Sequence, residues 1–495
     1  MILKNENKIM SDKLPPFYIT TTLPYVNAEP HIGHAMEFIR ADVIARYKKL
    51  LGCDVFFNTG TDEHGTKILE GAEKEGIPVQ EYVDRNAARF KELFPKLGIS
   101  EDIHFIRTTD NVHIKAAQEM WKRCDANGYI YKKEYEAKYC VGCELYKTDS
   151  ELEGGKCPIH PNRDIEIIKE ENYFFAFSKL ESKLKELYKN NPTLVIPDFR
   201  FNEIKAFVDR GLEDFSISRL KSKMSWGVPV PGDDDHVMYV WFDALTSYIS
   251  TLGWPDAVGD YRYWKEGTPV QYCGKDNLRQ QSAIWQAMLL AAELPATHNI
   301  IIDGFIISGG QKMSKSIGNV INPFDILEMF KDVTGYPEDV LRFILTHEVS
   351  SFEDGDLTID SIKTAYTAHL ANGIGNLTSR IMKMITVNNI TGIEIPESSW
   401  ADEYISALES YDTNKAIILV MREVQSLDEY IQSTEPFKLI KTDKEKAEAI
   451  LRECAARLYG VGRMLNPFLP KTSRLIKSLV QENKMPEKPL FARLA

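Results

Sequence analysis

Residues 17–65, FYITTTLPYVNAEPHIGHAMEFIRADVIARYKKLLGCDVFFNTGTDEHG, decide the fold of this chain of 495 residues. Their first part, FYITTTLPY (17–25), is rich in β-branched and aromatic residues and predicts a buried strand. Residues 33–52 then carry apolar side chains at helical spacing, and residues 53–65 return to a short strand that ends in a loop. Because a strand, a helix and a strand follow one another at this spacing, we expect a βαβ unit in a parallel sheet.

The same alternation is interrupted and later resumes. Residues 121–235 consist of charged and aromatic runs that show no alternation of strand and helix patterns. The alternation returns in HVMYVWFDALTSYI (236–249), VQYCGKD (270–276) and SAIWQAMLLAA (282–292). From residue 361 onward, long amphipathic segments predict helices throughout. The sequence therefore predicts an α/β protein whose parallel sheet is split by an insertion and is followed by an all-helical part.

These patterns divide the chain into six expected parts. They are an N-terminal extension (1–14), the first half of the sheet domain (15–120), the insertion (121–235), the second half of the sheet domain (236–305), a loop region (306–360) and the helical part (361–495).

Composition excludes several classes of protein. Hydrophobic residues at 43% and charged residues at 27% are typical of an ordinary globular protein. No apolar run approaches the ~20 residues that cross a membrane, and the first residues lack the apolar core of a signal peptide. We therefore expect a cytoplasmic protein with no membrane partner. The net charge of −12 argues against coating nucleic acid through bulk charge, although it allows a local basic face.

The insertion contains a set of potential metal ligands in YCVGCELYKTDSELEGGKCPIHP (139–161). Cys140 and Cys143 are separated by two residues, and Cys157 and His160 repeat that spacing. Zinc binds three thiolates and one imidazole as a tetrahedral site, and four protein ligands leave no open position for catalysis. We expect one structural Zn²⁺ that stabilises an insertion with too little core to fold alone. A disulfide is the alternative, which a reducing compartment disfavours.

A second motif, PHIGHAME (30–37), lies between the first predicted strand and the start of the predicted helix. A helix N-terminus offers free N–H groups and partial positive charge, which suit a phosphate. Gly33 would let a nucleotide lie against the backbone, and His31 and His34 would supply neutral donors. Taken alone, the motif slightly favours the alternative, a helix-capping turn with incidental histidines.

A third motif, GGQKMSKSIGNVINPF (309–324), combines two glycines with two lysines. Gly309 and Gly310 predict a flexible hinge, and Lys312 and Lys315 place two ammonium groups on the loop behind it. Such a loop can close over a triphosphate and neutralise the charge of a transition state. A solvated surface loop is the alternative for the lysines alone.

Together, His-Ile-Gly-His and Lys-Met-Ser-Lys-Ser resemble the paired signatures of class I aminoacyl-tRNA synthetases, over about residues 15–480. TTLPYVNAEPHIGHA, NTGTDEHGTKI, YVWFDALTSYI, GKDN and LANGIGNLTSR are further similar to methionyl-tRNA synthetases, in the form with a single zinc knuckle. The synthetases for isoleucine, valine and leucine need a large editing domain, and this insertion is too short for one.

The resemblance implies a Rossmann-like catalytic domain, a stem-contact region around the lysine loop and an anticodon-binding helical bundle. It implies ATP-dependent formation of methionyl-adenylate, followed by transfer to the terminal adenosine of initiator and elongator methionine tRNAs, with Mg²⁺ accompanying ATP. No enzyme nucleophile is needed, because both steps depend on positioning and charge stabilisation. The residues implied in catalysis are His31, His34, Lys312 and Lys315, and those implied in binding ATP are His31, Gly33, His34, Gly274, Asp276 and Lys315.

The implied methionine pocket comprises Leu23, Tyr25, Asp62, Ala244, Tyr248, Gln281 and Trp285. Asp62 would hold the ammonium group, and the aromatic walls suit a soft, apolar thioether. For Asp62 the alternative is a helix N-cap, and for Trp285 it is core packing. Gln281 stands where the family commonly has histidine, which puts the detailed shape of the pocket in question.

In the helical part, Asn376 and Arg380 match the residues that read the anticodon, and Phe437 stands where the family often has a stacking tryptophan. A solvated helix face is the alternative for Arg380, and bundle core is the alternative for Phe437. The chain ends after this bundle without an OB-like dimerisation domain, so we expect a monomer. Two other functions are alternatives: a class I ligase or nucleotidyltransferase for another substrate, and a synthetase-like protein that binds RNA without catalysis.

Overall fold

The structure is a computed structural model that describes residues 14–27, 29–143, 145–147, 151–256, 260–313, 319–395 and 400–494. The chain divides into two compact units, and each unit is made of segments that are not contiguous in the sequence. Unit 1 contains residues 1–29, 53–91 and 102–302, and unit 2 contains residues 30–52, 92–101 and 303–495. The helix after the first strand therefore belongs with the C-terminal half of the chain.

Unit 1 is built on a six-stranded sheet in the order β3-β2-β1-β12-β13-β7. Strand β1 pairs in parallel with both β2 and β12, and β2–β3 and β13–β7 are also parallel. The strands are β1 (Phe17–Thr21), β2 (Val55–Thr61), β3 (His104–Arg107), β7 (Val195–Ile196), β12 (Thr268–Gly274) and β13 (Asn299–Asp303). All five residues of β1 are buried, as expected for a central strand covered on both faces. The predicted α/β class and parallel sheet are confirmed.

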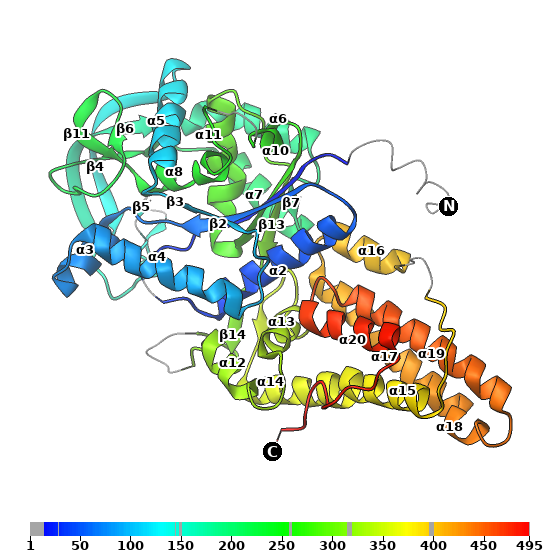
Figure 1. The fold of residues 1–495 in the computed structure, drawn as a ribbon. Coiled ribbons are helices and arrows are strands. Elements are labelled where there is room, and N and C mark those ends of the chain that lie inside the picture. The colour runs from blue at the N-terminus through cyan, green and yellow to red at the C-terminus, as the bar shows by residue number, and fades with distance from the viewer. Residues whose placement is uncertain are drawn as a thin grey trace. The chain divides into compact units, whose positions relative to one another are not determined.

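Helices and short helical turns accompany this sheet in unit 1 (Figure 1). They are α3 (Thr66–Glu75), α4 (Val79–Lys96, which continues into unit 2), α5 (Asn111–Ala126), α6 (Glu181–Asn190), α7 (Asp198–Asp209), α8 (Val240–Ala244), α9 (Ser247–Ser250), α10 (Arg262–Lys265), α11 (Gln286–Ala291), η3 (Phe177–Leu180), η4 (Lys275–Asn277) and η5 (Gln280–Trp285). The segment η5 is a π-helix, a form that is rare and frequent at functional sites.

The insertion forms an antiparallel sheet in the order β5-β4-β6-β8, with a smaller sheet β10-β11-β9 beside it in the chain. Its strands are β4 (Ile130–Cys140), β5 (Leu145–Lys147), β6 (Glu166–Phe175), β8 (Phe215–Ser216), β9 (Ser218–Leu220), β10 (Pro229–Val230) and β11 (Asp233–Met238). β4 and β6 pair from Ile130↔Phe175 to Tyr139↔Glu166, so the predicted metal ligands lie at the far end of a long hairpin. Midway through the insertion, β7 returns to the edge of the parallel sheet.

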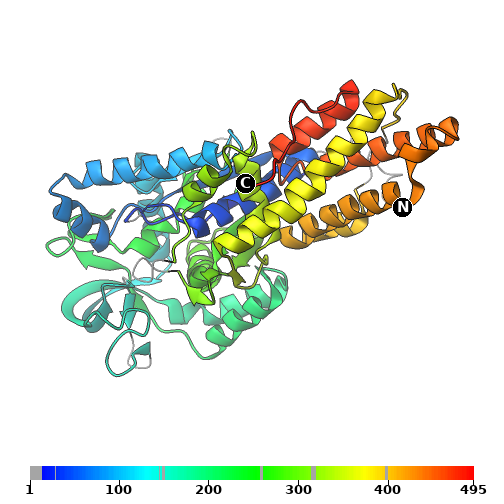
Figure 2. The same ribbon diagram turned by 90° about the horizontal axis from the view of Figure 1, so that it is seen from below.

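Unit 2 is mainly helical, as the sequence predicts. Its elements are α2 (Ile32–Leu50), β14 (Ile306–Ser308), β15 (Gln311–Lys312), α12 (Pro323–Phe330), α13 (Pro337–His347), β16 (Gly355–Asp356), α14 (Ile359–Ala365), η6 (Tyr366–Gly375), α15 (Asn376–Val387), α16 (Asp402–Glu409), α17 (Thr413–Thr434), α18 (Pro436–Leu439), α19 (Lys444–Met464) and α20 (Pro470–Glu482). The yellow segments α14, η6 and α15 form one nearly continuous rod in Figure 2, alongside the orange helices α17 and α19. In the described part of the chain, no helix has the length and apolar character needed to span a membrane.

Buried ion pairs attach α2 to the rest of unit 2. Asp42 and Arg342 lie 2.8 Å apart, and both side chains are fully buried. The amide and hydroxyl of Ser100 donate to the same carboxylate at 2.9 and 2.5 Å. Arg40 is paired with Asp303 at 3.2 Å. A buried charge is tolerated only when it is paired and hydrogen-bonded, so these contacts fix the helix that carries His31 and His34.

Candidate functional site

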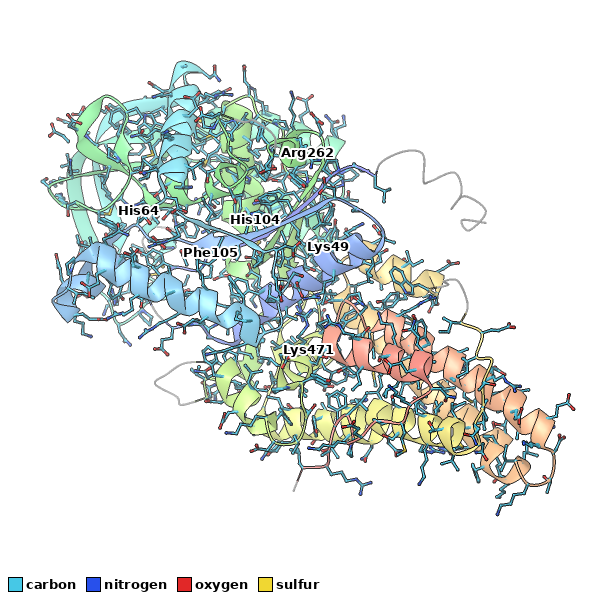
Figure 3. All side chains as sticks on the ribbon, in the orientation of Figure 1. Lys49, His64, His104, Phe105, Arg262 and Lys471 are labelled. Atoms are coloured by element: carbon cyan, nitrogen blue, oxygen red, sulfur yellow. The ribbon has the colours of Figure 1, made fainter. Side chains whose placement is uncertain are left out.

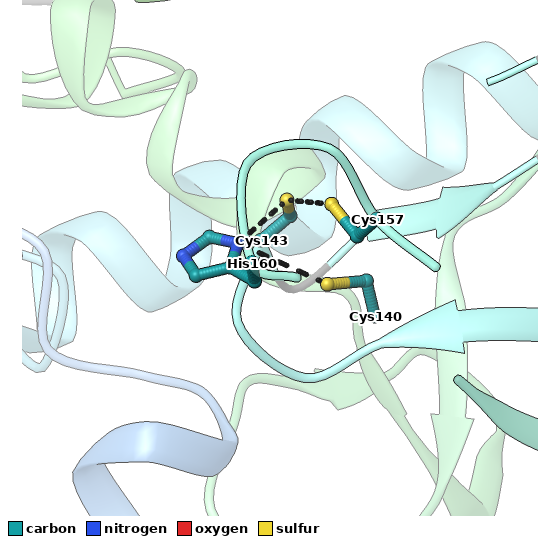
Figure 4. Close-up of side chains that lie close together, drawn as sticks. All are labelled: Cys140, Cys143, Cys157 and His160. Atoms are coloured by element: carbon teal, nitrogen blue, oxygen red, sulfur yellow. Dashed lines mark hydrogen bonds between the residues drawn. The ribbon is translucent and has the colours of Figure 1, made fainter. Parts of the chain in front are cut away.

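The four predicted metal ligands come together at the end of the β4–β6 hairpin (Figure 4). The donor atoms of Cys140, Cys143, Cys157 and His160 all lie within 4.8 Å of one another. The Sγ of Cys143 is 3.3 Å from the Sγ of Cys157 and 3.2 Å from Nδ1 of His160, and no disulfide joins the pair. Three sulfurs and one imidazole are the donor set of a structural zinc site. The cluster can therefore hold a metal ion.

Glycines make this cluster possible. A Cβ on Gly142 would lie 2.4 Å from Cγ and 2.7 Å from Nδ1 of His160, so no side chain fits between the first two cysteines and the imidazole. Gly154 and Gly155 have φ values of +60° and +79°. They form a two-residue turn in which Glu153 and Lys156 exchange both backbone hydrogen bonds, at 2.9 and 3.1 Å. The turn leads the chain directly into Cys157.

The two histidines of the second motif cap α2. Nδ1 of His31 accepts from the amide of Gly33, and Nδ1 of His34 accepts from the amide of His31, both at 3.2 Å. An accepting Nδ1 carries no proton, so each ring holds its proton on Nε2. Burial, followed by the neighbouring His31, holds the pKa of His34 well below its usual value. The capping turn is therefore real, and it orients neutral imidazoles as Nε2–H donors.

The lysine motif begins in the β14–β15 hairpin of unit 2. Gly309 and Gly310, with φ values of +63° and +74°, form its turn, and their amides donate to the Asp356 carboxylate at 2.8 and 2.9 Å. The two glycines are thus held in a tight turn, where the sequence suggested a hinge. The backbone of Lys312 ends β15, and Lys315 lies outside the described residues.

In unit 1, the predicted substrate residues follow three neighbouring strands at their carboxyl ends. Leu23 and Tyr25 follow β1, Asp62 follows β2, and Gly274 and Asp276 end or follow β12. The backbones of Tyr25 and Asp62 form a parallel bridge, and the amide of Asp62 donates to Pro24 at 2.9 Å. β1 lies between β2 and β12, where the strand order reverses. Ligands of open α/β sheets bind at such a switch point.

The structure excludes the alternative role of Asp62 as a helix N-cap. Helix α3 is preceded by Gly65 at its N-cap, and no side chain caps it, so Asp62 is not the N-cap. Asp62 is 7% exposed and therefore buried.

The remaining predicted pocket residues lie on α8, α9 and η5. Nε2 of Gln281 donates to the Tyr248 hydroxyl, and Oε1 of Gln281 accepts from Nε2 of Gln271 at 2.8 Å. The Trp285 ring meets that of Tyr248 edge to face, with centroids 5.8 Å apart. Trp285 and Gln281 are 0% and 1% exposed, and Ala244 is 8% exposed. Gln281, which stands where the family commonly has histidine, therefore contacts Tyr248 directly.

Trp285 also fits the alternative of core packing, since it belongs to the main hydrophobic core of unit 1. Its indole N–H is buried and has no hydrogen-bond partner among the described residues. Gln281 and Trp285 both lie in the π-helical turn η5, which the sequence did not predict. A wider turn redirects side chains relative to an α-helix.

A buried carboxylate network that sequence reasoning missed joins two of these segments. Asp243 precedes Ala244 and accepts from Nδ1 of His64 and from Nε2 of His113, both at 2.6 Å. His64, labelled in Figure 3, lies two residues beyond Asp62. Burial alone would raise the pKa of Asp243, but the two imidazoles outweigh it and hold the pKa at about 2. The three residues are far apart in the chain, and no local pattern joins them.

In unit 2, the predicted anticodon residues follow the π-helical segment η6. Asn376 is the first residue of α15 and is exposed, and Arg380 lies one turn later, paired with Asp428 of α17. Phe437 on α18 is 46% exposed, so it is not part of the bundle core. The structure therefore leaves Phe437 accessible for stacking.

Comparison with known proteins agrees with the fold and the sequence motifs described above. The family described as "tRNA synthetases class I (M)" matches residues 17–166 and 162–382. The fold and the signature motifs thus define a class I aminoacyl-tRNA synthetase.

The methionine--tRNA ligase of Brucella suis is 39% identical over 481 residues, covering 94% of this chain and 91% of the relative, and that of Rickettsia felis is 38% identical over 97% and 94%. A solved structure of Mycobacterium tuberculosis methionyl-tRNA synthetase in complex with methionyl-adenylate has a TM-score of 0.86 and 33% identity, covering 94% of both chains. The chain belongs to the methionyl-tRNA synthetase family.

Proposed function

We propose that this chain activates methionine with ATP and transfers the methionyl group to methionine tRNAs through the residues described above. The observation that carries the proposal is the position of Leu23, Tyr25, Asp62, Gly274 and Asp276 at the carboxyl ends of β1, β2 and β12, together with family membership. In unit 1, a pocket at the switch point of a parallel sheet suits an adenylate-forming enzyme. Separately, unit 2 offers neutral imidazole donors at a helix N-terminus, which suit phosphate oxygens.

In the first step, the methionine carboxylate attacks the α-phosphate of ATP, and pyrophosphate leaves. The Nε2–H groups of His31 and His34 donate to phosphate oxygens, and the N-terminus of α2 adds partial positive charge. Lys312 and Lys315 neutralise negative charge on the triphosphate. These groups stabilise charge that develops during the reaction, without acting as nucleophiles. Gly274 and Asp276 contact the adenosine.

Asp62 holds the ammonium group of methionine, because its nearly buried carboxylate makes a strong partner for a cation. The thioether packs among Leu23, Ala244, Tyr248 and Trp285. The Tyr248 hydroxyl is held by Gln281, so the tyrosine ring has a fixed orientation at the sulfur.

Two metal ions take different parts. One structural Zn²⁺ would be held by Cys140, Cys143, Cys157 and His160, where it closes the end of the β4–β6 hairpin. Mg²⁺ enters as the ATP complex. In the second step the terminal adenosine of the tRNA takes the methionyl group, while Asn376, Arg380 and Phe437 contact the anticodon. We further propose that the protein acts as a cytoplasmic monomer.

Aminoacylation of total tRNA with radiolabelled methionine tests this proposal, using the chain and its Asp62→Ala variant. The wild-type chain should charge tRNA, and the variant should lose at least ~100-fold in kcat/KM because the ammonium loses its partner. Specific tRNA binding without charging or adenylate formation would instead support the non-catalytic RNA-binding function.

A further inference from the structure

A second group of metal-ligating side chains lies in unit 2, apart from the cysteine cluster. His347 is the last residue of α13, Glu348 follows it, and His369 lies in the π-helical segment η6. One donor atom from each side chain lies within 4.8 Å of the others. Among the described residues, these three and the cysteine cluster are the groups with such a spacing of possible ligands.

The contacts within this group bring the donors together without satisfying all of them. Nδ1 of His347 lies 2.6 Å from a carboxylate oxygen of Glu348. The His347 and His369 rings are tilted by 49° with centroids 4.6 Å apart, and Phe343 stacks on His347 at 4.7 Å. Within the described part of the chain, the His369 ring nitrogens form no side-chain hydrogen bond, although the ring faces the other two ligands.

We propose that His347, Glu348 and His369 form a second metal site, which binds a divalent transition-metal ion such as Zn²⁺. Two imidazoles and one carboxylate are a ligand set that suits zinc, cobalt and nickel. Bonds of about 2.0–2.2 Å around a tetrahedral ion place ligand atoms about 3.3–3.5 Å apart. Small side-chain rotations bring a group with donors within 4.8 Å to that spacing. Three protein ligands leave a position open for water.

The burial of the site favours an exchangeable ion. The side chain of His347 is 13% exposed and that of Glu348 is 26% exposed, so the ligands are held by the protein while solvent still reaches them. An ion here would join the end of α13 to η6. Since η6 leads directly into α15, the metal would restrain the segment that carries Asn376 and Arg380.

Cobalt distinguishes the two sites. The full-length chain, loaded with a single equivalent of zinc for the cysteine cluster, is titrated with Co²⁺ alone, and bound cobalt is counted after equilibrium dialysis while the visible spectrum is recorded. We expect one additional equivalent of Co²⁺ with ligand-field absorption and no thiolate-to-cobalt charge-transfer band. Binding should also slow amide hydrogen exchange across residues 366–375.

Three variants locate the site. His369→Gln and Glu348→Gln should each weaken binding of the additional Co²⁺ by at least 10-fold, and His298→Gln, which removes an exposed imidazole outside the group, should leave it unchanged. If one variant fails to fold, as judged by circular dichroism, the other decides. The proposal is overturned if the wild-type chain binds no additional equivalent, if the bound cobalt shows a thiolate band, or if folded variants bind it with unchanged affinity.

Discussion

Replacing Asp243 with asparagine should loosen the methionine pocket and destabilise unit 1. The Asp243 carboxylate is fully buried and accepts from His64 and His113 at 2.6 Å each. An asparagine has the same shape, but its amide presents an N–H₂ group to one of the two imidazole donors. One buried imidazole N–H then loses its acceptor. The hydrogen bond that links the segment of Asp62 and His64 to the segment of Asp243 and Ala244 is weakened or lost.

The size of the effect follows from the pKa of Asp243. The difference between the ordinary value of 3.8 and about 2 corresponds to about 2.5 kcal/mol of preference for the charged form. The expected loss of stability is larger, about 3–5 kcal/mol, because removing one partner of a buried charged pair leaves the other partner buried and unpaired. Because the folded pKa lies below the unfolded one, this stability is fully present above pH ~4 and is lost as the pH falls through about 2.

Urea unfolding at pH 7 and pyrophosphate exchange at varied methionine concentration measure the two consequences. Asp243→Asn should lower the free energy of unfolding by about 3 kcal/mol and raise KM for methionine by at least ~10-fold, while KM for ATP changes by less than ~2-fold. Asp234→Asn, the same change at an exposed position of β11, serves as the matched control. A loss below about 0.5 kcal/mol with unchanged KM for methionine would refute the reasoning.

Three further predictions concern the other sites. Gly142→Ala should release zinc to a chelator at least ~10-fold faster than the wild type, since the new Cβ displaces His160; Gly335→Ala, whose Cβ meets nothing within 4 Å, should not. Gln281→His should retain activity and shift KM for methionine several-fold in pyrophosphate exchange, and an unchanged constant would show that this residue does not line the pocket. Arg380→Ala should reduce aminoacylation far more than adenylate formation, because its partly exposed ion pair with Asp428 contributes less than about 1 kcal/mol to stability; equal losses of both activities would indicate misfolding.

Much of the fold could be predicted from local patterns. The buried strands β1 and β2, the metal ligands at the hairpin end and the helical C-terminal part all have short-range signatures: apolar runs, two-residue spacings and amphipathic periodicity. The residues proposed for the substrate pocket could be predicted only through resemblance, because each one alone is compatible with ordinary core packing.

What was missed depends on long-range contacts. The Asp42–Arg342 pair attaches α2 to unit 2 across 300 positions, and the Asp243 network joins three distant segments. Neither pairing leaves a periodic signal in the sequence. The π-helical turns η5 and η6 were also missed, since a shift from i→i+4 to i→i+5 bonding hardly changes the apolar pattern of a helix.

Amino-acid-dependent ATP–pyrophosphate exchange, measured with the purified chain and each of the twenty amino acids, tests the central claim most directly. The account predicts exchange with methionine alone, because the residues proposed for the pocket, Asp62, Tyr248 and Trp285, would select an ammonium group and a thioether together. Exchange with a different amino acid, or no exchange by the folded, zinc-loaded chain, would contradict it.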